Sequence, residues 1–311
     1  MRAILLCAGR GVRFRPVTER IPKPLLPFLN VPLAVAHLRR LHEAGFREVA
    51  VNLHHLADQV ERDLSQPAAG LPELAFFREP RILGTAGALR NAAEFLAPDD
   101  FVVVNSDAAL AVDYPGLMAA HRASGRAATL LVVENREPER YTPLQAEGDR
   151  IAAFGLRGPG PLPDTPLLYT GVCVLAPRLL GRIPAGETAL VADLWQPLLD
   201  ERVEEIGWVR HSGPFADLGR PGDFLRASLE ALARGGPFPI GAGDFDRTRR
   251  VLHAAELPAD IVDAVSVIGD ARIGRGASVV RSAVWGGATV GDGARLDGCL
   301  LARGRVPAGA D

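Results

Sequence analysis

The sequence predicts an α/β domain with a mixed, mainly parallel sheet, followed by a short left-handed parallel β-helix. Two observations predict this fold class. Strand-like and helix-like apolar patterns alternate over the first 100 residues, and aliphatic residues recur at six-residue steps after about residue 260. A stretch rich in glycine and proline at 235–243 separates the two patterns. We therefore expect one domain over residues 1–235 and a second over residues 245–311.

In the first domain, short apolar runs predict buried strands, and apolar residues at helical spacing predict helices. The expected strands cover 3–7, 49–53, 74–77, 101–104, 129–133, 151–154 and 169–175, and the expected helices cover 33–44, 55–64, 85–95 and 223–233. Gly45 is expected to end the first helix, because glycine readily adopts the left-handed conformation of a C-cap. Residues 158–166 predict a surface loop. Ligands of such sheets bind beyond the carboxyl ends of the strands, where residues 8–16 and 105–107 fall.

The C-terminal pattern is typical of hexapeptide repeats. Its in-phase aliphatic residues are Val267, Ile268, Ile273, Val279, Val290 and Leu296, with one five-residue slip near Trp285. In a parallel β-helix each of them points into the coil, and glycine or alanine occupies the tight corners. About three coils fit, and so short a stack exposes apolar ends. We therefore expect the coils to dock against the first domain, or to form a homo-oligomer with another subunit.

Composition excludes several classes of protein. Hydrophobic residues make up 48% and charged residues 23%, which supports a packed core. The 35 basic and 37 acidic residues give a net charge of −2 without a polybasic run, so neither nucleic acid nor a membrane is an expected partner. The chain has no apolar stretch long enough for a membrane span. Its three cysteines form no CxxC motif, which predicts a reducing, cytoplasmic location.

The basic residues are almost all arginine. Of the 35, only Lys23 is a lysine. Against that usage, a single lysine indicates a place where a compact ammonium is needed and a planar guanidinium does not serve. Chance is the alternative, and the count alone does not separate the two.

A glycine-rich loop follows the first strand. Residues 9–16 read GRGVRFRP, and they lack the GK[ST] of a Walker A loop and the third glycine of a dinucleotide fingerprint, where Phe14 stands. Glycines leave backbone N–H groups free for anions. Arg13 and Lys23, on either side of the turn, suit a triphosphate, with one charge on the leaving pyrophosphate and one on the α-phosphate. An arginine-rich surface turn is the alternative.

Three further positions are candidates. Glu79 precedes residues 84–89 (GTAGAL), where a helix begins with small residues that permit either close packing or a flat base against the backbone. Asp107 and Asp217 each follow an expected strand or turn, and two such carboxylates can share one Mg²⁺ with phosphate oxygens. A lone aspartate at a strand end is more often a turn or cap residue, so only the combination favours a metal site.

Together these motifs resemble the sugar-1-phosphate nucleotidylyltransferases, particularly the mannose-1-phosphate guanylyltransferases. The resemblance covers nearly the whole chain. Besides the glycine loop and Lys23, it includes the segments 52–54, 83–89, 104–107, 169–171 and 217–221, in the family's order, and the C-terminal repeats. It implies a Rossmann-like nucleotidyltransferase domain that transfers a nucleoside monophosphate from an NTP to a sugar-1-phosphate, with Mg²⁺ as cofactor.

The resemblance also implies residue roles. Arg13, Lys23 and Asp107 are the expected catalytic residues, and Asp107 and Asp217 the expected metal ligands. The residues expected to bind nucleotide are Leu6, Ala8, Gly9, Gly11, Arg13, Lys23, Glu79, Gly84 and Thr85, and those expected to bind the sugar are Asn105, Thr170 and Gly171. The solitary lysine thus stands where the family has its signature lysine.

Two departures from the family keep alternatives open. Ser106 replaces a glycine before the first metal-binding aspartate, where a side chain is expected to crowd the sugar or change its selection. A second lysine that often meets the sugar phosphate is absent, and Arg157 is the candidate to replace it. The alternatives are a uridylyl- or thymidylyltransferase of another sugar-1-phosphate, or a non-catalytic regulator that binds nucleotide sugars.

Overall fold

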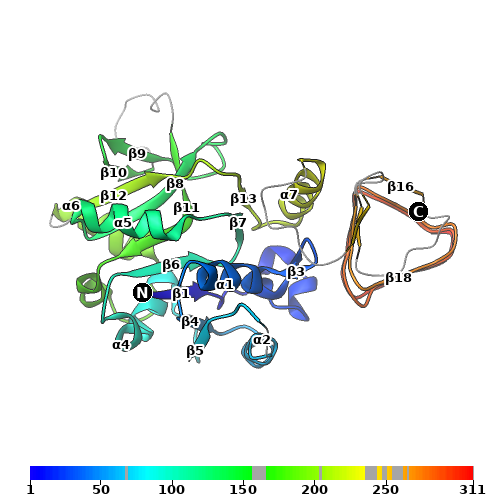
Figure 1. Cartoon of the computed structure of the whole chain (residues 1–311), viewed down its shortest axis with the longest axis horizontal. Coiled ribbons are helices and arrows are strands. Elements are labelled where there is room, and N and C mark those ends of the chain that lie inside the picture. Colours follow the sequence, from blue (N-terminus) through cyan, green and yellow to red (C-terminus); the bar gives the residue numbers. More distant parts are fainter. Residues whose placement is uncertain are drawn as a thin grey trace. The chain divides into compact units, whose positions relative to one another are not determined.

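In a computed structural model the chain forms two compact units (Figure 1). The described residues are 1–66, 69–155, 166–202, 205–234, 244–246, 251–253, 262–264 and 266–310. Arg157, the expected linker and nearly all of the expected surface loop lie outside them. Unit 1 consists of Met1–Arg10, Ala34–Ala108 and Val112–Phe215, and unit 2 of Gly11–Leu33, Ala109–Ala111 and Ala216–Asp311. This grouping differs from a cut near residue 240, because residues 11–33 pack with the C-terminal part. The expected domain division stays a prediction.

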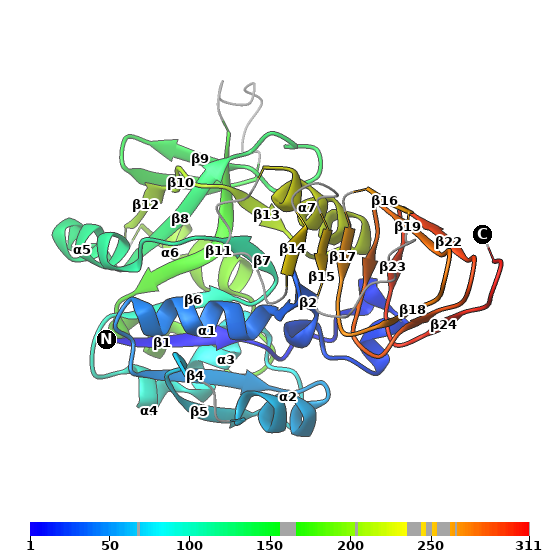
Figure 2. The ribbon, with the colours of Figure 1, turned by 45° about the vertical axis from the view of Figure 1, so that its right-hand side comes forward.

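Unit 1 contains a nine-stranded sheet in the order β5-β4-β1-β6-β11-β8-β12-β10-β9. Its strands are β1 Arg2–Leu6, β4 Glu48–Leu53, β5 Glu73–Arg78, β6 Phe101–Asn105, β8 Ala128–Glu134, β9 Leu144–Glu147, β10 Arg150–Phe154, β11 Leu167–Leu175 and β12 Ile206–Arg210. Strands β5, β4, β1 and β6 are parallel, and β11 is antiparallel to both β6 and β8. The prediction of a mixed, mainly parallel sheet is confirmed (Figure 2).

The four expected helical regions are helical with two local differences. The helices are α1 Leu33–Glu43, α2 Ala57–Leu64, α3 Gly84–Asn91, α4 Ala93–Leu96, α5 Tyr114–Ser124, α6 Gln196–Glu201 and α7 Pro221–Arg234, of which α5 and α6 are further helices that were not expected. The single helix expected over 85–95 is two helices, because Ala92 leaves helical geometry at φ −98° and ψ 16°. Helix α2 starts later than expected, since Leu56 adopts a left-handed φ of 52°. Gly45, at φ 91°, ends α1 as predicted.

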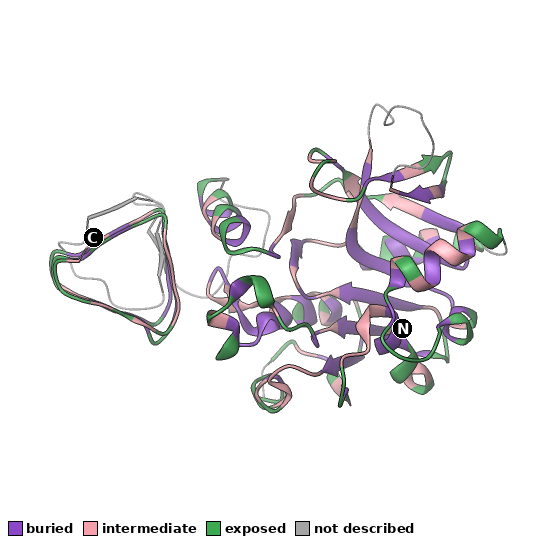
Figure 3. Ribbon diagram, turned by 180° about the vertical axis from the view of Figure 1, so that it is seen from behind, coloured by how far each residue is buried: buried purple, intermediate pink, exposed green. Residues whose placement is uncertain are grey.

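The core of unit 1 lies along the central strands (Figure 3). Ile4 of β1 and Val103 of β6 are fully buried, as expected for strands with apolar runs. Trp195, also fully buried, stacks on Phe154 and meets Tyr169 edge-on. Trp195 lies in the π-helical turn Leu190–Trp195 just before α6. It is therefore a packing residue.

The C-terminal part of unit 2 is a short parallel β-helix. Its strands form three parallel stacks: β15 Val251–His253, β17 Ser266–Ile268, β20 Ala283–Val284 and β23 Leu300–Leu301; β16 Val262–Ala264, β19 Ser278–Val280 and β22 Arg295–Asp297; and β18 Arg272–Ile273, β21 Thr289–Val290 and β24 Arg305–Val306. Strand β14 (Asp244–Asp246) pairs antiparallel with β15. Ile273 pairs with Val290 and Val290 with Val306, so one coil takes 17 residues and the next 16. Val279 and Val290 point into the coil with at most 1% exposure.

An aromatic cluster joins the coils to the rest of unit 2. Phe224 of α7 is fully buried, and its ring meets those of Phe14, Phe28 and Trp285 at centroid distances of 5.8, 5.6 and 5.5 Å. The Asn30 side chain donates a 3.1 Å hydrogen bond to the carbonyl oxygen of residue 268. The coils therefore dock on helix α7 and on the segment 11–33 of their own chain. Association of the coils with another subunit stays a prediction.

Candidate functional site

The carboxyl ends of four neighbouring strands meet at one edge of the unit 1 sheet. Leu6 ends β1, where it pairs with Asn52 of β4 on one side and with Asn105 of β6 on the other. Glu79 follows β5, the next strand along this edge. The structure thus brings together strand ends that carry expected nucleotide-binding and sugar-binding residues. This edge is where ligands of parallel sheets bind.

The chain beyond β1 offers backbone rather than side chains. Ala8 is 5% exposed, whereas Gly9 is exposed and a Cβ placed on it would meet no described atom within 4 Å. No described neighbour therefore requires glycine at position 9. Because Gly9 has no side chain, a flat ligand can approach its backbone closely.

A buried hydrogen-bond relay links the ends of β1, β4 and β5. The backbone N–H of Cys7 donates to Asn52 Oδ1 at 2.7 Å, and Asn52 Nδ2 donates to Glu79 Oε1 at 2.8 Å. Glu79 Oε2 accepts the backbone N–H of Leu83 at 2.9 Å. Asn52 and Glu79 are each 3% exposed. Sequence reasoning expected Glu79 beside the nucleotide, but the structure shows its carboxylate oxygens engaged by an amide and by backbone.

The turn before α3 is held from its other side by Thr188. Gly84 has φ 72°, and a Cβ there would lie 2.3 Å from the carbonyl oxygen of Thr188. The Thr188 N–H donates to the carbonyl oxygen of Leu83 at 2.8 Å, and the Thr85 hydroxyl accepts the N–H of Leu190 at 2.9 Å. Position 84 therefore requires glycine for two reasons: the Thr188 backbone leaves no room for a Cβ, and the left-handed φ disfavours other residues. Sequence reasoning missed Thr188, which lies about 100 residues further along the chain.

The residues expected to bind the sugar lie where β6 and β11 pair. A Cβ on Gly171, at φ 88°, would lie 2.9 Å from Asn105 Nδ2, so these two residues are brought together. The Thr170 hydroxyl donates to the Leu131 carbonyl oxygen at 2.8 Å within a β-bulge of β11. Thr170 is 3% exposed, so its side chain supports the bulge and its backbone is the part available to a ligand.

Ser106 and Asp107 form the turn after β6. The Ser106 hydroxyl donates to the Leu6 carbonyl oxygen at 2.7 Å, and Ser106 is 7% exposed. Asp107 is half-buried and directly precedes β7 (Ala108–Leu110). Strand β7 pairs with β13 (Phe215–Asp217), the strand that ends in Asp217.

In unit 2, the glycine loop and Lys23 are packed against each other. Gly11, at φ 60°, approaches Thr18 and Lys23 so closely that a Cβ would lie 2.8 Å from Thr18 Cγ2 and 3.1 Å from Lys23 Cβ. The Thr18 hydroxyl donates to the Gly11 carbonyl oxygen at 2.8 Å. Lys23 begins a 3₁₀ turn between Pro22 and Pro24 and is 9% exposed. Lysine is rarely so buried, which agrees with a specific task for its ammonium.

Arg13 and Asp217 of unit 2 converge on Gly219. A Cβ on Gly219 would lie 2.9 Å from Asp217 Oδ1 and 3.1 Å from both terminal nitrogens of Arg13. The Gly219 N–H donates to Asp217 Oδ1 at 2.9 Å. The carboxylate of Asp217 and the exposed guanidinium of Arg13 thus both lie next to Gly219, which has no side chain to keep them apart. In such a pair the carboxylate can bind a metal ion, and the guanidinium can bind the phosphate groups that bring this ion.

Residues 2–155 match the sequence profile of the family described as nucleotidyl transferase. The chain carries a nucleotidyl transferase domain. This match confirms the expected enzyme class, nucleotidyltransferase, at the level of that domain.

Three known proteins are similar to this chain over most of its length. The catalytic subunit beta of mannose-1-phosphate guanylyltransferase from Drosophila pseudoobscura pseudoobscura is 31% identical over 72% of this chain, which spans 60% of that relative's length. The mannose-1-phosphate guanylyltransferase of Mycobacterium tuberculosis is 28% identical over 97% of this chain and 83% of its own. HddC from Yersinia pseudotuberculosis, solved in complex with GMP-PN, is 21% identical, with a TM-score of 0.61 over 74% of this chain and 98% of its own. This last likeness confirms the fold.

The carboxylates of the candidate site suit Mg²⁺ that arrives bound to a substrate. Among the described residues no three His, Cys, Asp or Glu side chains are grouped to hold a metal ion. Mg²⁺ needs no such cage, since it keeps several waters and takes one or two carboxylates together with substrate phosphates. Asp217, beside the guanidinium of Arg13, offers that chemistry. The assignment of Asp107 and Asp217 as ligands stays a prediction.

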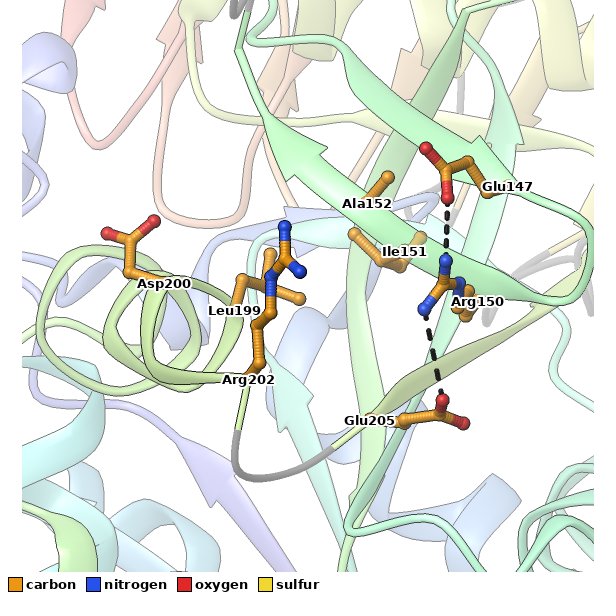
Figure 4. A pocket seen from close by; sticks show the side chains of 8 residues that line it. All are labelled: Glu147, Arg150, Ile151, Ala152, Leu199, Asp200, Arg202 and Glu205. Carbon is orange, nitrogen blue, oxygen red and sulfur yellow. Dashed lines mark hydrogen bonds and ion pairs between the residues drawn. The ribbon is translucent and has the colours of Figure 1, made fainter.

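A cavity of about 420 Å³ lies at the other end of the sheet, between β9, β10 and α6 (Figure 4). Its charged lining includes Arg150, which pairs with Glu147 at 2.7 Å and with Glu205 at 3.9 Å. The described residues that line it include none of the expected site residues. It is therefore separate from the strand edge described above.

In the described part of the chain, no helix combines the length and apolarity needed to cross a bilayer. The cytoplasmic location expected from the cysteines stays a prediction.

Proposed function

We propose that the protein transfers a nucleoside monophosphate from an NTP to a sugar-1-phosphate, and that it is a mannose-1-phosphate guanylyltransferase. The observation that carries the proposal is the meeting of Arg13 and Asp217 at Gly219, which suits a polyphosphate with its metal ion. The nucleotidyl transferase domain supports the reaction class. The names of the two sequence relatives support guanosine and mannose.

The proposed reaction is an in-line displacement at phosphorus. An oxygen of the sugar-1-phosphate forms a bond to the α-phosphorus of the NTP, and the bond from that phosphorus to the bridging oxygen of pyrophosphate breaks. Arg13 holds the β- and γ-phosphates, and Lys23 neutralises the α-phosphate and the sugar phosphate. Asp107 and Asp217 would hold Mg²⁺, which would supply further charge neutralisation. Catalysis is then positioning and electrostatic stabilisation, without a covalent enzyme intermediate.

The base and the sugar are proposed to lie against backbone. Ala8, Gly9 and Gly84 offer backbone groups to the base, because their side chains are small or absent. Asn105 and Gly171 offer the sugar a side-chain amide next to a residue with no side chain. Selectivity would then depend on the separation of these backbone segments.

A pyrophosphate-release assay tests the proposal. Mannose-1-phosphate, glucose-1-phosphate and other sugar phosphates are paired with GTP, UTP, dTTP, CTP and ATP in the presence of Mg²⁺. We expect the highest kcat/KM for GTP with mannose-1-phosphate. A higher value for UTP or dTTP with another sugar phosphate would replace the substrate assignment. Absence of turnover for every pair, with nucleotide-sugar binding retained, would favour the non-catalytic regulator.

A further inference from the structure

We propose that Asn52 and Glu79 are positioning residues that determine nucleobase selectivity. Their relay connects the backbone at residues 7–9 with the backbone at residues 83–84, and so fixes the separation of the two segments. This inference rests on the proposed function, which places the base against these segments. Neither side chain needs to touch the base, since each is only 3% exposed.

Only one assignment of donors and acceptors satisfies the relay, because its hydrogen bonds run from both ends toward Glu79. The N–H groups of Cys7 and Leu83 at its ends can only donate. Asn52 Oδ1 must therefore face Cys7, which turns Nδ2 toward Glu79. Glu79 then meets a donor on each oxygen, from Asn52 and from Leu83. Two acceptors at this position require a carboxylate, because a glutamine offers one acceptor and one donor group.

Both backbone segments are also held from the side away from the relay. The Ser106 hydroxyl binds the Leu6 carbonyl oxygen at 2.7 Å, and the Thr188 N–H binds the Leu83 carbonyl oxygen at 2.8 Å. The relay thus adds side-chain bonds between the ends of β1, β4 and β5, strands that lie next to one another in the sheet (Figure 2). Backbone groups at a fixed separation discriminate between bases, because a base with the wrong edge leaves buried polar groups unpaired.

The chemistry of the relay allows a reciprocal exchange. In Glu79→Gln, the new side-chain NH₂ group faces the NH₂ group of Asn52, so two donors oppose each other. Rotating the amide of residue 52 moves this mismatch to the N–H of Cys7, and rotating the amide of residue 79 moves it to the N–H of Leu83. Asn52→Asp places two carboxylates against each other. The double variant N52D/E79Q restores every bond: the new carboxylate of residue 52 accepts from Cys7 and from the new amide of residue 79, whose oxygen accepts from Leu83. The net charge and the number of hydrogen bonds are preserved, while the charge moves to residue 52 and the bond between the two side chains reverses its direction.

The experiment measures Kd for GTP, UTP and dTTP by calorimetry with Mg²⁺, and the KM of the sugar phosphate, in the full-length chain. A lost or mismatched buried hydrogen bond is worth about tenfold or more in an equilibrium constant. We expect each single variant to weaken the preferred nucleotide by at least about tenfold and to reduce its preference over the next base by a similar factor. The sugar-phosphate KM at saturating nucleotide should stay within about twofold. The double variant should recover the preference to within about threefold.

Thr129→Val is the matched control. Thr129 and His121 form a 2.8 Å hydrogen bond and are each 2% exposed, at the amino end of β8. Because β11 is antiparallel to both β6 and β8, this end lies at the edge of the sheet opposite the relay. T129V should lower the melting temperature and leave the base preference unchanged.

Three outcomes would overturn the inference: unchanged base preference in both single variants, a double variant that recovers nothing, or an equal change in T129V. If a single variant fails to fold, the double variant still decides, because it should fold and keep the preference. Absence of turnover in the wild type would refute the proposed function alone, since the Kd ratios are still measurable. Absence of nucleotide binding in the wild type would refute both.

Discussion

The Ser106 hydroxyl donates a 2.7 Å hydrogen bond to the carbonyl oxygen of Leu6, and so ties the end of β6 to the end of β1. From the sequence, the Ser106 side chain was expected to crowd the sugar or to change its selection. In the structure the side chain is 7% exposed and turned toward backbone. Ser106 therefore acts as a link between strands.

Replacing Ser106 by alanine should lower stability without changing sugar preference. Loss of one buried hydrogen bond costs about 1 kcal/mol, which corresponds to a melting temperature lower by a few degrees. Ser266→Ala is the matched control, because the Ser266 hydroxyl donates to the Val279 carbonyl oxygen at 2.9 Å within the coils. A wider or altered range of sugar phosphates in S106A would show that the side chain acts on the substrate after all.

Alanine at Gly84 should be far more damaging than alanine at Gly70. Both glycines have left-handed φ, 72° and 79°, which costs a residue with a side chain about 1 kcal/mol. Only Gly84 adds a collision, since its Cβ would lie 2.3 Å from the Thr188 carbonyl oxygen. Chemical denaturation should show G84A less stable than G70A by about 2 kcal/mol or more. Equal losses would mean that the turn can move away from Thr188.

Alanine at Gly219 should impair turnover more than folding. The added methyl group meets the flexible ends of Arg13 and Asp217, which can shift but then leave their places. We expect kcat/KM for pyrophosphate release to fall by about tenfold or more, with a small change in melting temperature. The control is Gly222→Ala in α7, where a Cβ meets no described atom within 4 Å. A G219A variant as active as G222A would contradict the role of the Arg13 and Asp217 pair.

Lys23 should tolerate neither alanine nor arginine. K23A removes the charge, and K23R places a larger planar group in a 9% exposed position. Turnover in both variants should fall by at least about two orders of magnitude, the loss expected for removing a charge that acts in the transition state. Arg20→Ala, at an exposed position three residues away, should retain activity. Turnover in K23R near the wild-type rate would show that any cation suffices.

Of the three cysteines, one should react with a thiol reagent in the folded protein. Burial raises the pKa of Cys7 and of Cys173 to about 12 in each case. Cys299 is partly exposed. At pH 8 the wild type should label at one thiol and C299S at none, while both should label fully in denaturant. The raised pKa values also predict that stability falls as the pH rises above about 9, where the unfolded thiols release protons first.

Local patterns predicted those parts of the fold that local residues determine. Apolar runs located β1, β4 and β6, and the spacing of aliphatic residues located the coils, because side-chain direction follows directly from the backbone period. The break at Ala92 was missed, since nothing in an alanine-rich segment marks the end of a helix. Strand β12 and helix α5 were also missed, since neither carries a motif or an uninterrupted apolar run.

The candidate site was only partly predictable. Gly84 and Gly171 were identified as site residues, and the structure shows why glycine is needed at each. Their partners, Thr188 and Asn105, are brought near by tertiary folding over long stretches of chain. The relay role of Glu79 also lies beyond sequence reasoning, because it depends on three strand ends lying side by side.

The grouping of residues 11–33 with the coils has a consequence for inherited or engineered changes. Phe14 sits next to Arg13 in the chain, and its ring shares with Trp285 a common neighbour, Phe224. Through Phe224, the repeats therefore support the loop that carries Arg13, the proposed phosphate-binding residue. A change that unfolds the coil carrying Trp285 should therefore displace Phe14 and lower activity through the neighbouring Arg13.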